Sequence, residues 1–485
     1  MNNYMRNLYL LISLLICAAP QIAAEDLLDI YQNALEYDPI MRGAEASYLA
    51  ALELRPQARS AIFPFVNFTA GETTSYSKDP NQPTNFATGQ PDPYIGSTKF
   101  DRDSSLWSVQ LEQTLFDWGR FLRLRQADKR IAQAEIGYQI ARQNLLVRVA
   151  TTYFLVLAAE DTLASQVSAR EAIGRQLEQA ERRFEVGLIA ITDAQEAQAG
   201  YDQAIAAEIL AKRNLATTQE YLREIIGESV VDLDGPVDEL PLLQPDPLNA
   251  EQWVQTALDR NLTLISSRIS SDIALDEISV QRSFRLPTLS FSAAFGQSSS
   301  DTVRTNNLFR AENGTFTCSV NTVTGLNNSF CPPERTMSGT DADNYFISLN
   351  FNIPLFTGGY NSSKIRQSVY ERRASLEDLE AISRATERET RDAYLSVISE
   401  ISRVKALSQA VTSSETALRA TEAGFEIGTR TTVEVLIAQN NLSTAETSYA
   451  RSRYDYILNV LRLRLAAGNL SVSDFEEVNG WLTGS

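Results

Sequence analysis

The sequence contains no histidine among its 485 residues. Catalytic triads, Cys-His pairs and His-ligated zinc sites all need an imidazole, so most common hydrolases and zinc enzymes are excluded. Basic residues are also few: 43 lysines and arginines stand against 61 acidic residues, which gives a net charge of -18 and a pI of about 4.7. Nucleic-acid-binding proteins carry a basic surface, so we expect no nucleic-acid partner.

Long hydrophobic runs are missing except near the start, where an apolar stretch covers residues 8–19. Arg6 precedes this stretch and small residues follow it just before Glu25, which is the pattern of a secretory signal peptide over residues 1–24. A membrane anchor is the alternative, but the stretch is shorter than the roughly 20 residues that a span needs. A lipoprotein signal at Cys17 fits less well, so we expect an exported protein with the signal removed.

Cysteine is rare, since the chain has three in all. If the first leaves with the signal peptide, Cys318 and Cys331 remain, in a segment rich in Asn, Thr, Gly, Ser and Pro. One such pair in an exported protein predicts a disulfide, which would close a loop of about 14 residues and contribute roughly 3 kcal/mol. Two free thiols are the alternative.

Proline is absent between Pro93 and Pro236 and again after Pro354. Both segments are rich in Ala, Leu, Gln, Glu and Arg, which favour helix. Apolar residues recur there every seven positions, at Leu124, Ile131, Tyr138 and Leu145. A continuous helix from about residue 120 to residue 183 would be roughly 95 Å long, which is too long for an ordinary globular domain. We expect long helices at about residues 118–183, 190–227, 359–424 and 431–468.

The two helical segments are copies of each other. Residues 183–227 match residues 424–468 at a constant offset of 241, and Tyr153 and Tyr394 keep that offset. Matches upstream extend the similarity to the rest of each half, so the chain is predicted to be a tandem duplication of one helix-strand-strand-helix-helix unit. The expected organisation is a first repeat at 25–227, a proline-containing linker at 228–251, a second repeat at 252–468 and a tail at 469–485.

Each repeat also contains two stretches in which apolar and polar residues alternate. They cover about residues 63–77, 103–116, 287–300 and 343–356. Sheets with one buried face show the same pattern in soluble proteins, but strands of about ten residues with aromatic ends and polar loops in an exported chain are typical of membrane barrels. Four strands cannot close a membrane barrel, because an open edge in lipid leaves backbone groups unsatisfied. We therefore expect the chain to form an oligomer.

These features resemble the TolC-like channel-tunnels, the outer-membrane efflux and type I secretion proteins of Gram-negative bacteria. The most specific matches are residues 26–32, 183–193 and 424–431, and the similarity covers nearly the whole mature chain. The resemblance implies a mainly α fold with a transmembrane β-barrel. Three identical chains would form one 12-stranded barrel, in contact with outer-membrane lipid, and a long α-helical barrel in the periplasm. The linker and the tail would form an equatorial belt.

The resemblance also implies a function: an exit duct that couples through a periplasmic adaptor (membrane fusion) protein to an inner-membrane pump, either a drug transporter or an ABC secretion ATPase. Its cargo would be small toxic compounds, secreted polypeptides or both. The turns that follow the long helices would form the periplasmic tips where the adaptor docks; an ordinary helix end without a partner is the alternative. The residues implied for docking are Gly187, Leu188, Gly428 and Thr429.

A gate latch is implied at the same tips. Arg430 matches an arginine that links to a threonine and an aspartate in the family, here Thr192 and Asp193, and so holds the entrance closed. Gln176 and Glu422 match further positions of this network. Hydrogen bonds to charged groups contribute about 1.5–3 kcal/mol each, which suits a latch that a partner can open. A solvated surface pair is the alternative.

The sequence departs from the family pattern at two gate positions. Phe425 stands where the best-known members have a tyrosine that bonds the aspartate, so Asp193 needs another partner here and the latch is expected to be looser. Glu434 and Ile437 match two positions that carry aspartates in such members. One ring of three carboxylates, from Glu434, is therefore expected, with weaker block by multivalent cations. Glu434 as an ordinary exposed helix residue is the alternative.

Two other classes of function share part of this pattern. A trimeric coiled-coil surface adhesin with a β-barrel anchor would also combine export, heptads and strands. Such proteins usually place one anchor at the C-terminus, whereas each repeat here contains a strand pair and then resumes helix. An enzyme hypothesis rests on acid pairs such as Glu476 and Glu477, and adjacent acids on a polar tail are typical of solvated residues. We therefore expect no enzymatic activity, no cofactor and no metal site.

Overall fold

The computed structural model describes residues 25–81, 94–229, 232–237, 240–310 and 334–482. The signal peptide predicted over residues 1–24 and the disulfide predicted between Cys318 and Cys331 lie outside the described residues. The chain divides into a helical unit, residues 1–53, 129–275 and 370–485, and a sheet unit, residues 54–128 and 276–369. Among the described helices, none is both long enough and apolar enough to cross a membrane.

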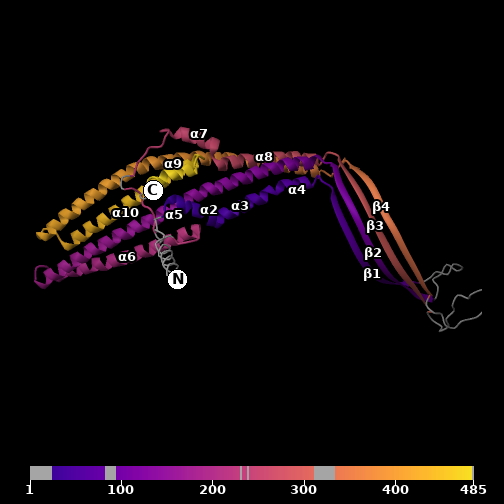
Figure 1. The fold of residues 1–485 in the computed structure, drawn as a ribbon, viewed down its shortest axis with the longest axis horizontal. Coiled ribbons are helices and arrows are strands. Elements are labelled where there is room, and N and C mark those ends of the chain that lie inside the picture. Colours follow the sequence, from indigo (N-terminus) through magenta and orange to yellow (C-terminus); the bar gives the residue numbers. More distant parts are fainter. Residues whose placement is uncertain (1–24, 82–93, 230–231, 238–239, 311–333, 483–485) are drawn as a thin grey trace, which may run out of the picture. The chain divides into compact units, whose positions relative to one another are not determined.

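Four long helices dominate the chain (Figure 1). They are α5 (Trp118–Glu185), α6 (Ile191–Ile226), α9 (Tyr360–Glu426) and α10 (Thr432–Ala466). Their bounds lie within two residues of those expected from the proline-free segments. Each is followed within two residues by a glycine with positive φ, a conformation that costs a residue with a side chain about 1–2 kcal/mol. The shorter helices are α2 (Leu27–Tyr37), α3 (Pro39–Leu52), α4 (Leu54–Ser60), α7 (Ala250–Arg260), α8 (Leu262–Ser283) and α11 (Val472–Asn479).

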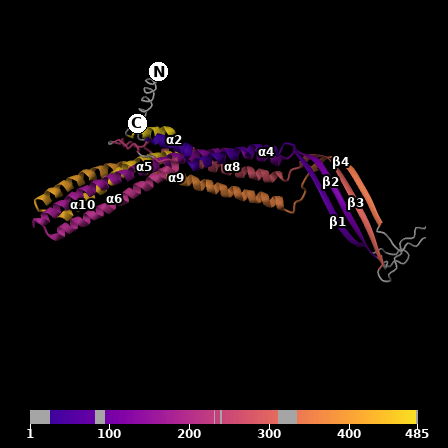
Figure 2. The same ribbon diagram turned by 60° about the horizontal axis from the view of Figure 1, so that its bottom comes forward.

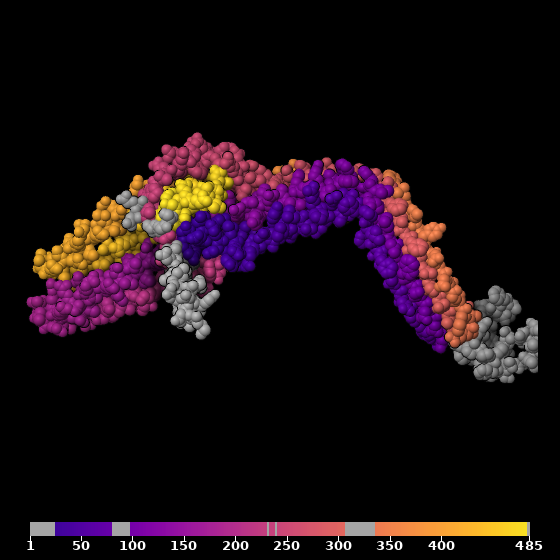
Figure 3. Space-filling view, in the orientation of Figure 1, coloured from indigo at the N-terminus to yellow at the C-terminus, as the bar shows by residue number. Residues whose placement is uncertain are grey.

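The main hydrophobic core of the helical unit lies midway along α5 and near the end of α10. Tyr153, Phe154, Tyr456 and Ile457 are all nearly or fully buried there. The first and last parts of the described chain close this core: the Asn479 side chain accepts a hydrogen bond from the N–H of Leu27 (3.1 Å) and donates one to Asp26 (2.8 Å). Figure 3 shows the C-terminal α11 (yellow) beside α2 (indigo).

The linker between the repeats is held on the helical unit by two β-bridges and by the side chain of Arg453. Its residue Leu233 forms a β-bridge with Glu25, and Pro236 forms one with Leu482. The Arg453 guanidinium donates to the carbonyl oxygens of Pro236 (3.2 Å) and Val237 (2.6 Å). The linker therefore packs between the beginning and the end of the described chain, where proline prevents it from continuing a helix.

The sheet unit contains one antiparallel sheet of four strands in the order β1-β2-β3-β4 (Figures 1 and 2). The strands are β1 (Phe65–Asn81), β2 (Tyr94–Phe116), β3 (Thr288–Arg310) and β4 (Glu334–Asn352). They extend farther toward the loops than the alternation suggested, because polar residues continue the ladder there. At the other end β4 stops at Asn352 rather than at residue 356, and Pro354, which has no N–H to donate, follows it.

Candidate functional site

The turn between α5 and α6 is built around Gly187, whose φ is +76°. The N–H of Gly187 donates to the carbonyl of Phe184 (2.9 Å), and the N–H of Leu188 donates to that of Arg183 (2.8 Å). These two bonds form a Schellman motif, which satisfies carbonyls at the end of α5. Helix α6 then begins with Ala190 as its N-cap, which provides no side-chain hydrogen bond.

The turn between α9 and α10 repeats this backbone. Gly428 has a φ of +80°. Its N–H donates to the carbonyl of Phe425 (3.1 Å), and the N–H of Thr429 donates to that of Gly424 (2.8 Å). The Thr429 hydroxyl adds a third bond to the same Gly424 carbonyl (3.0 Å). The glycines predicted at the tips are therefore required by the helix ends themselves, whether or not a partner binds there.

Glu434 connects the side chains of the second turn. It forms a capping box with the N-cap residue Thr431: the Thr431 hydroxyl accepts from the Glu434 N–H (3.3 Å), and the Glu434 carboxylate accepts from the Thr431 N–H (2.8 Å). Arg430 Nη1 lies 2.6 Å from the other carboxylate oxygen. The backbone hydrogen bond from Thr431, followed by the bond from Arg430, lowers the pKa of the Glu434 carboxyl below its usual 4.5. Glu434 is therefore ionised and paired at neutral pH.

Arg183 connects the two turns. Its guanidinium lies over the ring of Phe425, 4.7 Å from the centroid, and Nη1 donates to the Phe425 carbonyl (3.3 Å). The Phe425 side chain is 5% exposed and packs with Leu418, Val435 and Leu442. A cation above an aromatic face is attracted by its quadrupole. Phe425 is therefore an anchor between the repeats, a role that the comparison with a tyrosine hydroxyl did not suggest.

Within one chain, the residues predicted for the latch do not contact one another as the latch requires. Arg430 pairs with Glu434, and no hydrogen bond or ion pair joins it to Thr192 or Asp193 among the described residues. The side chains of Thr192 and Asp193 have no partner in the described part of the chain. Gln176, on α5, has a buried side-chain oxygen without a hydrogen-bond donor, again within the described residues.

The surfaces of the two turns also differ. In the first, Val186 is 70% and Leu188 is 72% exposed. In the second, Ile427 is 77% exposed, but Thr429 takes the place of Leu188 and turns its hydroxyl onto the backbone. Apolar side chains exposed together at a helix end are typical of contact surfaces for a protein partner.

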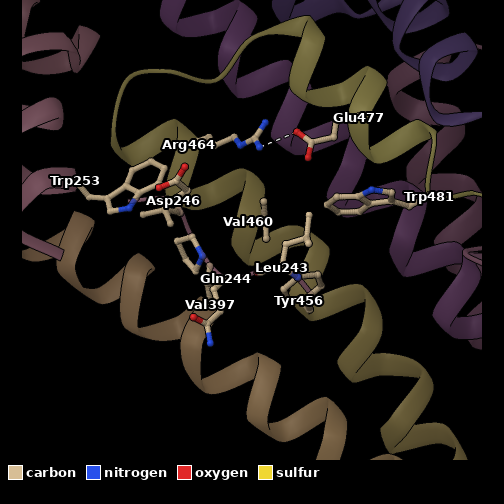
Figure 4. Close-up of a pocket in the computed structure, with 12 residues that line it drawn as sticks. Leu243, Gln244, Asp246, Trp253, Val397, Tyr456, Val460, Arg464, Glu477 and Trp481 are labelled. Atoms are coloured by element: carbon tan, nitrogen blue, oxygen red, sulfur yellow. Dashed lines mark hydrogen bonds and ion pairs between the residues drawn. The ribbon is translucent and has the colours of Figure 1, made fainter. Parts of the chain in front are cut away.

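A pocket of about 220 Å³ lies where the linker meets α7, α9, α10 and the tail (Figure 4). Two of its hydrogen bonds hold the linker in place, and an ion pair joins α10 to α11. The N–H of Leu243 donates to the Tyr456 hydroxyl (2.8 Å), Trp253 Nε1 donates to the Pro247 carbonyl (2.8 Å), and Arg464 binds Glu477 (2.8 Å). The pocket is therefore explained by the packing of the linker.

Comparison with known proteins agrees with this architecture. The family model described as outer membrane efflux protein matches residues 30–228 and 253–469, close to the two predicted repeats. Outer membrane protein TolC of Vibrio cholerae serotype O1 is 34% identical over 463 residues, which is 95% of this chain and 94% of that protein. The alkaline protease secretion protein AprF of Pseudomonas aeruginosa is 28% identical over 457 residues, 93% of this chain and 86% of that protein.

A solved structure shares the fold. The CmeC outer membrane channel of Campylobacter jejuni has a TM-score of 0.68 at 16% identity, and the match covers 95% of this chain and 90% of that chain. The resemblance inferred from residues 26–32, 183–193 and 424–431 is thereby confirmed at the level of the family. The chain belongs to the outer membrane efflux protein family and is an outer-membrane channel for efflux or secretion.

Proposed function

We propose that three copies of the chain form a trimeric exit duct, in which twelve strands close one barrel and the long helices form a periplasmic α-barrel. The observation that carries this proposal is an open sheet with one apolar face. The strands β1 and β4 pair on one side each, so the sheet has two free edges within the chain. Free edges in lipid leave backbone groups unsatisfied, and joining β4 of one chain to β1 of the next removes all of them.

The apolar face supports the same assembly. In β4, Tyr345 and Ile347 are 81% and 75% exposed, and both lie on the same face as Leu349 and Phe351. The register aligns Tyr345 with Phe295, Val109 and Phe68 across the sheet. The other face of β4 is mostly polar and carries Asn344, Ser348 and Asn350, with Phe346 as its one large apolar side chain between Asn344 and Asn350. A barrel with the apolar face toward lipid and the polar face toward the lumen follows from this pattern.

We propose further that the two helix-helix turns form the periplasmic entrance, where an adaptor from a pump complex docks on Gly187, Leu188, Gly428 and Thr429. Arg430 would hold the entrance closed by binding Thr192 and Asp193 of a neighbouring helix pair, since those two side chains have no partner among the described residues of their own chain. Arg430 is already paired with Glu434. In the latch, Arg430 would therefore either keep Glu434 as an additional partner or release it to bind Thr192 and Asp193. Glu434 would also provide the acidic ring, and Gln176 and Glu422 would extend the network.

The experiment is single-channel conductance of the purified protein in a planar bilayer, comparing wild type, Arg430→Ala and Arg384→Ala. Arg384 is the matched control, because it also forms an exposed i,i+4 ion pair on α9, with Glu380 at 2.8 Å. We expect small cation-selective events that become several-fold larger in Arg430→Ala and do not change in Arg384→Ala. Equal conductance in all three proteins would keep the channel but remove Arg430 from the gate. Inserted trimers without conductance would favour the adhesin alternative.

A further inference from the structure

The strands are longer than a membrane requires. They contain 17, 23, 23 and 19 residues, whereas a tilted membrane strand needs about 9–11. On the apolar face, large hydrophobic side chains are concentrated between Phe351 and the row of Tyr345, Phe295, Val109 and Phe68, with Trp107 just beyond. Between 11 and 15 residues of each strand therefore lie beyond that row, on the side of the loops.

The outer part of this face carries charge in a definite order. Residues two apart along a strand share a face, and so do residues paired in register. Beyond the apolar band the face carries acids, at Asp343, Glu72, Asp341, Asp103, Asp301 and Asp101, and the row of Asp101 also carries the apolar side chains of Tyr76, Val303 and Met337. It then reaches a row in which Lys78 pairs with Lys99, Lys99 with Thr305 and Thr305 with Arg335. We call Lys78, Lys99 and Arg335 the cationic row.

The cationic row differs from the arginines on the opposite face. There, Arg102 Nε donates to Thr302 Oγ1 (3.2 Å) and Arg304 lies over the ring of Phe100, 5.7 Å from its centroid. None of the three cations of the row has a hydrogen bond or an ion pair within the described ranges of the chain. Like charges placed opposite each other on one face destabilise a sheet, and Asp101, two residues from Lys99 on the same face, forms no ion pair with either lysine among the described residues. Lys78 beside Lys99 therefore favours an anionic partner from outside the chain.

The height of the row restricts that partner. Arg335 lies ten residues along β4 from Tyr345, about 34 Å at 3.4 Å per residue, and about 25 Å above the apolar band after a strand tilt near 40°. The headgroup layer of an ordinary bilayer is only about 5–8 Å thick. Phospholipid phosphates would meet the acidic residues and be repelled. The partner must carry its anionic groups much farther from the hydrocarbon.

We propose that the cationic row binds the phosphorylated glycolipid of the outer leaflet, lipopolysaccharide, through the anionic groups of its core sugars. This glycolipid combines a membrane anchor with a thick anionic sugar layer, which matches a lipid-facing surface whose cations stand well above the apolar band. The inference rests on the barrel proposed above, since barrel closure turns this face toward the membrane. In a trimer, the row would form a ring of nine cations around the outer end of the barrel.

The test is binding of purified lipopolysaccharide to the full-length trimer in detergent. The variant Lys99→Gln/Arg335→Gln removes two cations from the outer face, and Arg102→Gln/Arg304→Gln removes two from the opposite face as a matched control. We expect the first to weaken binding of full-core lipopolysaccharide about tenfold or more, because each such cation contributes about 1 kcal/mol near an anionic surface. The matched control should bind like wild type, and the charge-preserving Lys99→Arg/Arg335→Lys should retain affinity.

Two further probes locate the contact. Lipopolysaccharide truncated to its innermost sugars and phosphatidylglycerol should bind wild type and the outer variant equally, since neither reaches the row. Equal binding of full-core lipopolysaccharide to wild type and the outer variant would overturn the proposal. So would an equal loss in the two Gln variants, or a loss with phosphatidylglycerol. Conductance of the same preparations separates this failure from that of the proposed function. A trimer that conducts ions but shows no difference in lipopolysaccharide binding between the variants would contradict only the glycolipid site.

Discussion

The turn at Gly187 and the turn at Gly428 share one backbone conformation but differ in their side-chain contacts. Each ends a long helix with the same pair of Schellman hydrogen bonds and a glycine near φ +80°. The first then leaves Ala190 without a side-chain cap and exposes Leu188, while the second binds Glu434 to both Thr431 and Arg430. After duplication, the requirement of the helix end for glycine remained in both copies, and the solvent-facing positions were free to diverge.

Both turns expose one aliphatic side chain, Val186 or Ile427, but only the first also exposes Leu188 and only the second has the polar contacts of Glu434. A docking partner that buries Leu188 gains hydrophobic free energy, whereas one that contacts Arg430 must compete with Glu434. In the proposed gate, the first turn would suit adhesion to a partner and the second would suit an exchange of ion pairs.

The largest effect is expected where the turns are the same. Gly187→Ala and Gly428→Ala should each reduce the local opening free energy by about 1–2 kcal/mol, because both force a side chain into positive φ. No atom lies within 4 Å of an added Cβ at either position, so the cost is conformational only. Amide hydrogen exchange of the turn peptides measures it. Gly137→Ala, inside α5 and equally open, should instead stabilise by about 0.5–1 kcal/mol. Unequal costs at the two turns would contradict their equivalence.

Removing the cap should make the second turn behave like the first. Thr431→Ala takes away the hydroxyl that accepts from the Glu434 N–H, and we expect the start of α10 to lose about 1 kcal/mol of local stability. Hydrogen exchange in the first turn of α10 should accelerate accordingly, approaching the rates at the start of α6. Unchanged exchange would show that the cap contributes nothing there.

The reverse change should give the first turn a cap. Ala190→Ser introduces an N-cap hydroxyl with Asp193 at the third helical position, and we expect a gain of about 0.5–1 kcal/mol at the start of α6. Aspartate can complete such a box, since Asp474 accepts from the N–H of the N-cap Ser471 at 2.7 Å in α11. Ala190→Val is the control, because it adds bulk without an acceptor. Slower exchange with valine as well would rule out capping as the cause.

The smallest effect concerns pH. The pKa of Glu434 is lowered in the folded chain, so its stabilisation is complete above the ordinary value of 4.5 and disappears as the pH falls through the lower folded value. Protection of the first turn of α10 should therefore decline below pH 4.5, and the start of α6 provides the internal comparison. Glu434→Gln keeps an acceptor for the cap and should remove this dependence. A decline that persists in Glu434→Gln would assign it to another group.

Most of the helical architecture could be predicted because its signals are local. Proline-free segments, glycine after each helix and apolar heptads act over a few residues, and the helices begin and end within two residues of the expected positions. The strands were harder: alternation marks the apolar parts of β1 to β4, but Ser-, Thr- and Asp-rich extensions pair through the backbone alone and carry no hydrophobic pattern. At the site, the glycines are visible in the sequence, as is the i,i+4 spacing of Arg430 and Glu434 that predicts their ion pair.

The sequence by itself determined the duplication, the helix lengths and the glycine turns, since each depends on propensity and on contacts between neighbours in the chain. Only the tertiary structure decided that Arg183 lies over Phe425, 242 residues away, and that Asn479 closes the start of α2. It likewise decided which charges share a face of the sheet, because that depends on register across four strands. Contacts between distant segments depend on how the repeats pack, and no local pattern encodes them.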